Sequence, residues 1–268
     1  MLIHDRDPKG HLQSDWTERQ LELGNVPQAV LLRNLPSDVN GLLDQWHRAL
    51  LRWFLAPLAH NPESWVADLG SGYGRMAGEA AQMGFRNIIG LDYEAGFCRQ
   101  YQLDRGLAVR GSITQPPFAA HSLSAAYTIT ALMYVGFGRA ANGLKKLDAS
   151  LKPGARVLLL EAGSEFNRVS RMVFRRKRTQ SLAVDGFSHA ELNKIVPEGW
   201  TKIAAGNNAG ATLLLPLLLV TRRWPAVFDA LSAAAMRIDL PKPGFHDNGW
   251  RRICLHRWIL CEKPVNPS

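Results

Sequence analysis

Cysteine is scarce in this sequence, and no pair of cysteines is spaced for a metal or redox site. Only three of the 268 residues are cysteine (Cys98, Cys254 and Cys261), and they form no CxxC pair. Such a set argues against a disulfide framework, a zinc site or an iron–sulfur cluster, so no metal is expected. It also favours a reducing compartment, and we expect a cytoplasmic protein.

Long apolar runs are missing as well. Residues 213–220 read LLLPLLLV, which is far short of the roughly 20 apolar residues that cross a bilayer. Residues 1–7 hold no apolar core of signal-peptide length. The run at 213–220 is compatible with a buried core segment, a lid over an apolar acceptor or an interfacial anchor.

Positive charge is concentrated in the second half of the chain. Residues 1–134 hold 11 Lys and Arg against 13 Asp and Glu, whereas residues 135–268 hold 21 against 10. If residues 165–178 form a helix, one basic stripe results, made of Arg168, Arg171, Arg175 and Arg178. This pattern suits an anionic membrane surface, an anionic substrate or nucleic acid, or else the solvated face of a packed helix. Nucleic acid is the weaker choice because no appended nucleic-acid module is recognisable.

Three glycines alternate directly after a short apolar run. The segment reads Val66-Ala67-Asp68-Leu69-Gly70-Ser71-Gly72-Tyr73-Gly74-Arg75, and the helix-prone residues 76–83 follow. Without side chains at alternate positions, backbone N–H groups can close on a ligand at this strand-to-helix turn. Asp92 ends the next apolar run about 20 residues further on, where a carboxylate can accept both hydroxyls of a ribose. We therefore expect a nucleoside-containing cofactor.

The position of the acid relative to the glycines distinguishes two classes of cofactor. Gly72-x-Gly74-x-x-Ala77 satisfies the dinucleotide fingerprint, but the first glycine of that fingerprint usually follows the strand directly. Here Asp68 and Gly70 come first. The pattern Asp68-x-Gly70-x-Gly72-x-Gly74 resembles the first motif of class I S-adenosylmethionine (SAM) methyltransferases, which implies a loop around the amino-acid and ribose parts of SAM. A glycine-rich turn without a ligand is the alternative.

Later segments resemble the same family in the same order. They are residues 110–118, 122–134, 147–161, 187–192 and 258–264. The alternation of strands and helices predicts an α/β fold with a parallel sheet covered on both faces. Six strands are expected near 65–69, 87–92, 107–110, 124–131, 155–161 and 253–262. The resemblance implies a Rossmann-like, seven-stranded, mostly parallel sheet.

We expect additions to this core before and after the glycine loop. Residues 1–60 form a predicted N-terminal helical cap, in which Leu42, Leu43, Trp46, Leu50 and Trp53 lie on one apolar helix face. This helix either packs on the sheet or closes over substrate. Residues 61–268 form the predicted SAM-binding domain, with insertions near 163–186 and 206–245 that form a substrate lid.

The adenine end of the predicted cofactor site departs from the family pattern. Ser112 stands where the family usually has an acid that binds the adenine amino group, and Ser124 stands where it usually has Asp. Adenine recognition is then expected to rest on backbone groups near Ser112 and Ile113. The predicted cofactor residues are Asp68, Gly70, Ser71, Gly72, Tyr73, Gly74, Asp92, Tyr93, Ser112, Ile113 and Thr130.

Candidates for catalysis must lie at the carboxyl ends of strands. Tyr134 follows the fourth strand, Glu161 ends the fifth, and His246 lies beside an acid in a Pro- and Gly-bearing segment. Methyl transfer from a sulfonium needs mainly alignment, and a base is needed only where the acceptor holds its proton. Tyr73 could border the sulfonium through a cation–π contact.

The expected activity is methyl transfer to a small molecule, with S-adenosylhomocysteine (SAH) as the product. The resemblance is greatest to the small-molecule branch, because no Asn-Pro-Pro-Tyr motif of amino-group methylators and no nucleophilic cysteine follows the fourth strand. We expect a hydroxyl on a glycan-linked, lipid-linked or otherwise anionic acceptor. An RNA methyltransferase that uses the basic stripe and a non-catalytic SAM-binding protein are the alternatives.

Overall fold

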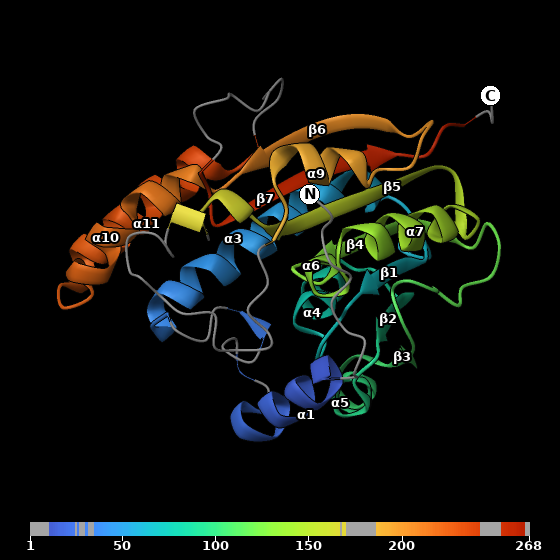
Figure 1. Cartoon of the computed structure of the whole chain (residues 1–268), viewed down its shortest axis with the longest axis horizontal. Coiled ribbons are helices and arrows are strands. Elements are labelled where there is room, and N and C mark those ends of the chain that lie inside the picture. The colour runs from blue at the N-terminus through green and yellow to red at the C-terminus, as the bar shows by residue number, and fades with distance from the viewer. Residues whose placement is uncertain are drawn as a thin grey trace.

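A seven-stranded sheet organises the chain (Figure 1). The computed structural model describes residues 11–24, 26, 30, 31, 35–166, 168, 169, 186–241 and 253–265, with only the backbone of 11–15. The strands are β1 (Val66–Leu69), β2 (Ile88–Asp92), β3 (Leu107–Arg110), β4 (Leu123–Ile129), β5 (Leu151–Ala162), β6 (Thr201–Asn207) and β7 (His256–Glu262). Their order in the sheet is β3-β2-β1-β4-β5-β7-β6.

The strand order indicates a ligand site at the carboxyl ends of the central strands. β1 pairs in parallel with both β2 and β4. The chain therefore adds β2 and β3 on one side of β1, and then crosses over to add β4 and β5 on the other side. In open α/β sheets a crevice forms there, at the carboxyl ends of the strands. β7 runs antiparallel to both of its neighbours, β5 and β6. The predicted Rossmann-like, mostly parallel sheet is confirmed.

Helices connect and flank the strands in the described part of the chain. They are α1 (His11–Leu23), α3 (Ser37–Leu55), α4 (Arg75–Gln82), α5 (Ala95–Arg105), α6 (Leu132–Val135), α7 (Phe137–Asp148), α9 (His189–Lys194), α10 (Ala209–Thr221) and α11 (Pro225–Asp239), with a 3-10 turn, η1, at Ala56–Leu58.

Two apolar layers pack on the two faces of the sheet. Alternate strand residues point to opposite faces: Val66 and Leu158 join one layer, whereas Ala67 and Leu159 join the other. The first layer takes α3 and α4, and the second takes α7 and α9. Helices thus cover both faces, as expected.

The predicted N-terminal helix is α3, and it packs on the sheet. Leu42, Leu43, Trp46 and Leu50 are buried on its inner face, and Trp53 packs against the same layer. This apolar face, rather than helix propensity alone, holds α3 in place. The division of the chain into a cap and a SAM-binding domain stays a prediction.

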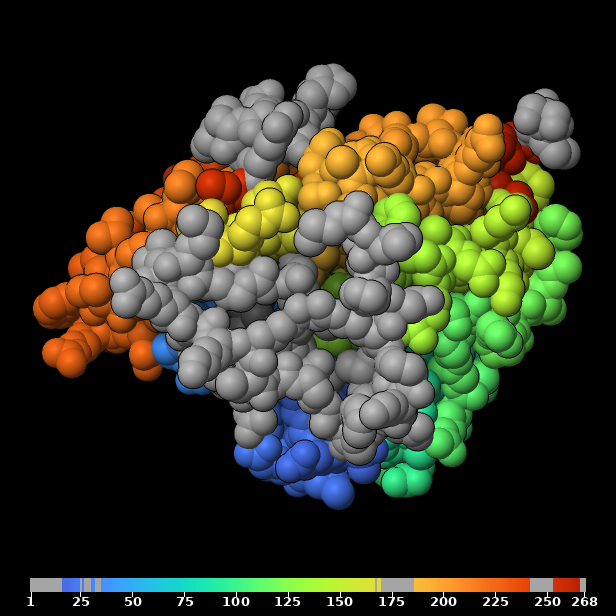
Figure 2. Space-filling model, viewed as in Figure 1, coloured from blue at the N-terminus to red at the C-terminus, as the bar shows by residue number. Residues whose placement is uncertain are grey.

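Residues 213–220 lie in α10, which forms a helical hairpin with α11. Leu213, Leu217 and Val220 are exposed to solvent, so the interpretation of this run as a buried core segment is wrong. The hairpin projects from one end of the molecule (orange in Figure 2). No helix among the described residues has both the length and the apolar character needed to cross a membrane.

Candidate cofactor and active site

The glycine loop joins β1 to α4 in a conformation that side chains disfavour. Gly70, Gly72 and Gly74 have φ angles of 71°, 53° and 86°, all in the left-handed region. Space is short as well, because a Cβ at Gly70 would lie 2.3 Å from Cβ of Ala131. The loop therefore turns sharply beside the end of β4. Its N–H groups donate within the chain: Gly70 and Ser71 to the carbonyl of Leu91, Gly72 to Asp92 and Gly74 to the carbonyl of Ser71.

Two buried carboxylates flank this loop. Asp68 is buried at the end of β1, and its Oδ2 has no hydrogen-bond partner among the described residues. Burial raises the pKa of Asp68 to about 7, while Tyr127 and Arg75 lower it and Asp92 raises it further. Asp92 accepts hydrogen bonds from Gly72 N at 2.8 Å and Glu94 N at 2.9 Å. Burial raises its pKa to about 6, despite these bonds.

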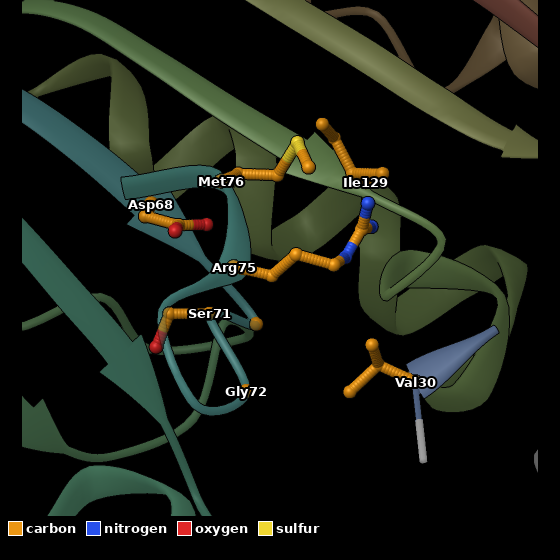
Figure 3. A pocket seen from close by; sticks show the side chains of 8 residues that line it. Val30, Asp68, Ser71, Gly72, Arg75, Met76 and Ile129 are labelled. Carbon is orange, nitrogen blue, oxygen red and sulfur yellow. The ribbon is translucent and has the colours of Figure 1, made fainter. Parts of the chain in front are cut away.

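A small cavity, partly open to solvent, lies between the loop, α4 and β4 (Figure 3). Its lining comprises Val30, Asp68, Gly70, Ser71, Gly72, Arg75, Met76 and Ile129. In Figure 3 the guanidinium of Arg75 extends across the cavity, toward Ile129 and away from Asp68 and Ser71. Ser71 Oγ is buried without a hydrogen-bond partner in the described part of the chain. The cavity thus combines apolar side chains, a cation and polar atoms free to bind a ligand.

Arg75 is a site residue that the sequence interpretation did not assign. It is buried, forms an ion pair with Asp44 on α3 and lies 3.4 Å from Nδ1 of His47. His47 in turn packs edge-on against His256 at the start of β7. Burial lowers the pKa of His256 to about 3, so this imidazole is neutral. The position of Arg75 directly after the last glycine was the signal that could have identified it.

The N-terminal segment packs over the glycine loop and this cavity. Thr17 on α1 donates a 2.6 Å hydrogen bond to Glu94, and Arg19 donates a 2.7 Å bond to the carbonyl of Leu31. Cγ1 of Val30 would lie 3.1 Å from a Cβ placed at Gly72. Residues far apart in the sequence thus close over the glycine loop.

The turn after β4 is held by Glu161. Its carboxylate is fully buried and accepts hydrogen bonds from the backbone N–H groups of Ala131, Leu132 and Met133 at 3.0–3.3 Å, and from Thr128 Oγ1 at 3.1 Å. Burial raises its pKa to about 7, although these bonds lower it. Thr130 within the turn has a φ of 57°, a strained value for a β-branched residue. Glu161 therefore lies at the predicted strand end, but its oxygens already bind this chain.

Tyr134 contacts the N-terminal segment at the end of the same turn. Its ring packs edge-on against Trp16, with centroids 5.0 Å apart. Burial raises its pKa to about 12, with Arg19 lowering it and Glu161 raising it. The phenol is therefore protonated at neutral pH and can donate a hydrogen bond.

The predicted adenine end lies past β3. Ser112 is exposed, and its hydroxyl bonds to Oγ1 of Thr114 at 2.8 Å, while Ile113 packs against the core. The carbonyl of Tyr93 accepts a 3.2 Å bond from Arg110. Tyr73 is half-buried in the glycine loop, and burial raises its pKa.

Some predicted residues fall outside the described part of the chain. They are His246 and, in the basic stripe, Arg171, Arg175 and Arg178. Among the described residues, no group of three His, Cys, Asp or Glu side chains is placed to hold a metal ion.

A comparison with protein families gives the decisive match. Residues 67–159, from β1 through most of β5, match the family described as "Methyltransferase domain". Residues 67–159 of this chain are therefore identified as a methyltransferase domain. A search of the curated proteins found no match.

Solved structures share the fold of this chain. Magnesium protoporphyrin IX methyltransferase from Synechocystis PCC 6803, with bound SAH, has a TM-score of 0.60 at 14% identity, over 94% of this chain and 96% of that one. Geranyl diphosphate C-methyltransferase from Streptomyces coelicolor A3(2) has a TM-score of 0.51 at 13% identity, over 85% and 84%. A putative sarcosine dimethylglycine methyltransferase from Galdieria sulphuraria has a TM-score of 0.54 at 13% identity, over 84% and 87%. At such identities the likeness establishes the fold, and the three names give different acceptors.

Proposed function

We propose that this methyltransferase transfers a methyl group from SAM to a hydroxyl of a small, anionic acceptor, such as a glycan- or lipid-linked molecule. The observation that carries the proposal is the cavity beside the glycine loop, where a buried cation and apolar side chains meet the buried carboxylate of Asp68. Each of these groups would have a separate task.

The loop side of the cavity fits SAM. Asp68 Oδ2 and Ser71 Oγ, both buried without a hydrogen-bond partner among the described residues, suit the ammonium and carboxylate of an amino acid. Asp92 would hold the ribose, since one carboxylate can accept both of its hydroxyls. Ser112 and Ile113 would border the adenine through their backbone groups. The cofactor, when bound, supplies a methyl group on a sulfonium, a carbon already activated for displacement.

Positioning is the task left to the chain. Correct alignment of two reactants contributes about 7–11 kcal/mol to lowering a barrier. Glu161 acts as a positioning residue, because it fixes the turn that carries Tyr134. The protonated Tyr134 would donate a hydrogen bond to the acceptor rather than remove its proton. Glu161 and Tyr134 therefore lack the features of a strong base, and His246 remains the predicted candidate for that role.

The acceptor side would combine positive charge with apolar surface. Arg75 crosses the cavity, and Arg19 lies close enough to Tyr134 to lower the pKa of its phenol. Met76, Ile129 and Val30 provide apolar surface. A molecule with an apolar body and an anionic group suits both features. Geranyl diphosphate, which is present in the structure of a methyltransferase of similar fold, is a molecule of this kind.

The test is methyl transfer from labelled SAM to fractionated cell extract. We expect label in the lipid or small-molecule fraction, and less than a tenth as much with Asp92→Asn. Tyr134→Phe, which keeps the ring against Trp16, should lower kcat roughly 10- to 100-fold without changing the affinity for SAH. Label confined to RNA would overturn the proposal in favour of an RNA methyltransferase. Absence of label from every fraction would contradict methyl transfer to any of these acceptors.

A further inference from the structure

An apolar surface covers the outer side of α10. Leu213, Leu217, Leu219 and Val220 are 64%, 53%, 39% and 62% exposed, while Ala211 and Leu218 on the other side are buried. Residues 213, 217 and 220 follow each other at steps of four and three, so they lie on one helix face. α10 holds no charged residue at all. An ordinary surface helix turns its polar face to water, and α10 turns an apolar one.

The tip of the hairpin has a different chemistry. Arg222, Arg223 and Trp224 connect α10 to α11, and all three are exposed. Trp224 is 56% exposed and Val227, one turn into α11, is 48% exposed. Arg222 reaches Asp38 at 2.8 Å. Tryptophan and arginine beside leucine is the composition of segments that lie at a lipid–water interface.

The base of the hairpin is fixed by buried hydrogen bonds. Asp239, at the end of α11, accepts bonds from Gly210 N at 2.6 Å and Ala211 N at 2.7 Å, which caps the first turn of α10. Thr212 Oγ1 accepts a 2.8 Å bond from Leu255 N. Trp46 Nε1 donates a 3.3 Å bond to the carbonyl of Asp239. These hydrogen bonds fix the orientation of α10, so its apolar face is held toward solvent.

The hairpin begins at the carboxyl ends of the strands, which is the end of the sheet where the candidate active site lies. Asn207, the last residue of β6, pairs with Arg257, which pairs with Glu161 on β5. A surface that the hairpin contacts would thus lie near the carboxyl ends of the strands.

We propose that the α10–α11 hairpin docks on an anionic lipid bilayer, with Leu213, Leu217 and Val220 in the interface and Arg223 at the headgroups. Charge favours this occupant: the hairpin exposes Arg222, Arg223 and Arg237 against Asp229, and the chain carries a net charge of +9. A basic tip is attracted to acidic lipid at about 1 kcal/mol for each cation near the surface. A second copy of the chain would present the same basic residues, which repel each other.

Vesicle flotation with the full chain tests the proposal. Vesicles of phosphatidylcholine with 30% phosphatidylglycerol (about one charge in three lipids) are compared with phosphatidylcholine alone. We expect the wild type to float with the anionic vesicles and to lose most of that binding in high salt. Leu217→Glu with Val220→Glu should weaken binding at least tenfold. The matched control is Leu103→Glu with Leu107→Glu, because these residues are 81% and 53% exposed, lie outside the hairpin and give the same change in net charge.

A second pair of variants tests the charge at the tip. Arg223→Glu should weaken binding about tenfold, whereas Lys145→Glu on α7, with the same change in net charge, should leave it within twofold. Melting temperatures of all variants should match the wild type, since each changed residue is exposed. Equal flotation of hairpin and control variants would overturn the proposal, as would absence of binding to anionic vesicles. A wild-type dimer that the Leu217/Val220 variant converts to a monomer, without flotation, would instead assign the face to self-association. None of these readouts requires methyl transfer, so they are independent of the proposed function.

Discussion

Replacing Gly70 by alanine would place a methyl group where Ala131 already lies. The added Cβ would be 2.3 Å from Cβ of Ala131, and the φ of 71° is left-handed. The conformational part costs about 1–2 kcal/mol for an L-residue. The overlap adds about 1–3 kcal/mol, the usual cost of overpacking. We expect a total loss of about 2–5 kcal/mol in the free energy of unfolding, measured by urea denaturation, and weaker SAH binding by calorimetry.

Gly84 provides the matched control for this substitution. Its φ of 93° is also left-handed, but nothing lies within 4 Å of an added Cβ. Gly84→Ala should therefore lower the free energy of unfolding only by the conformational part, and it should leave the affinity for SAH unchanged. Adding Ala131→Gly to Gly70→Ala should recover the overlap part, apart from the roughly 0.5–1 kcal/mol that a new glycine costs. If Gly70→Ala and Gly84→Ala lose equal stability, the close approach of the loop to the β4 turn is refuted.

Three further predictions concern the site. Asp92→Asn should weaken SAH binding at least tenfold by calorimetry, because bonds to a charged group are worth about 1.5–3 kcal/mol; unchanged affinity would remove Asp92 from the ribose site. Burial raises the pKa of Glu161 from 4.5 to about 7, so its contribution to stability is complete below pH 4.5 and is lost as pH rises through about 7. Between about pH 4.5 and 7, the interval between the two pKa values, the fall of unfolding free energy with rising pH should therefore be shallower in Glu161→Gln than in wild type, and equal slopes would contradict this. Thr17→Val removes the bond that ties α1 to Glu94 and should speed SAH dissociation about tenfold, whereas Thr221→Val, which loses only a bond to Leu217 within α10, should not.

Local patterns in the sequence predicted the cofactor side of the site. Gly70, Gly72 and Gly74 all adopt a positive φ, which glycine tolerates far better than other residues. This signal is local, so it can be read from the sequence without knowledge of the tertiary structure. The strands that carry Asp68 and Asp92 are buried and apolar, so their positions were also readable. The edge strand β6 was not located, because its first residues are exposed and lack an apolar alternation.

Local sequence patterns could not predict which residues pair with the buried charged side chains. Arg75 pairs with Asp44, which lies 31 positions earlier, and only packing of α3 against α4 brings the two together. Glu161 was placed correctly at a strand end, but its bonds to the turn at 131–133 depend on how β4 ends. The outward face of α10 depends on the anchor at Asp239, which is remote in the sequence and carries no local signal.

The position of β7 constrains the order in which the sheet can be completed. β5 and β6 are both finished when residue 207 has been made, yet they do not pair with each other, and the strand between them starts only at His256. Until then each presents a row of unsatisfied backbone groups, which invites pairing with another chain. During synthesis, at about 5–20 residues per second, that exposure lasts several seconds. The half of the sheet next to the hairpin is therefore the part of this protein most in need of protection while it is being made.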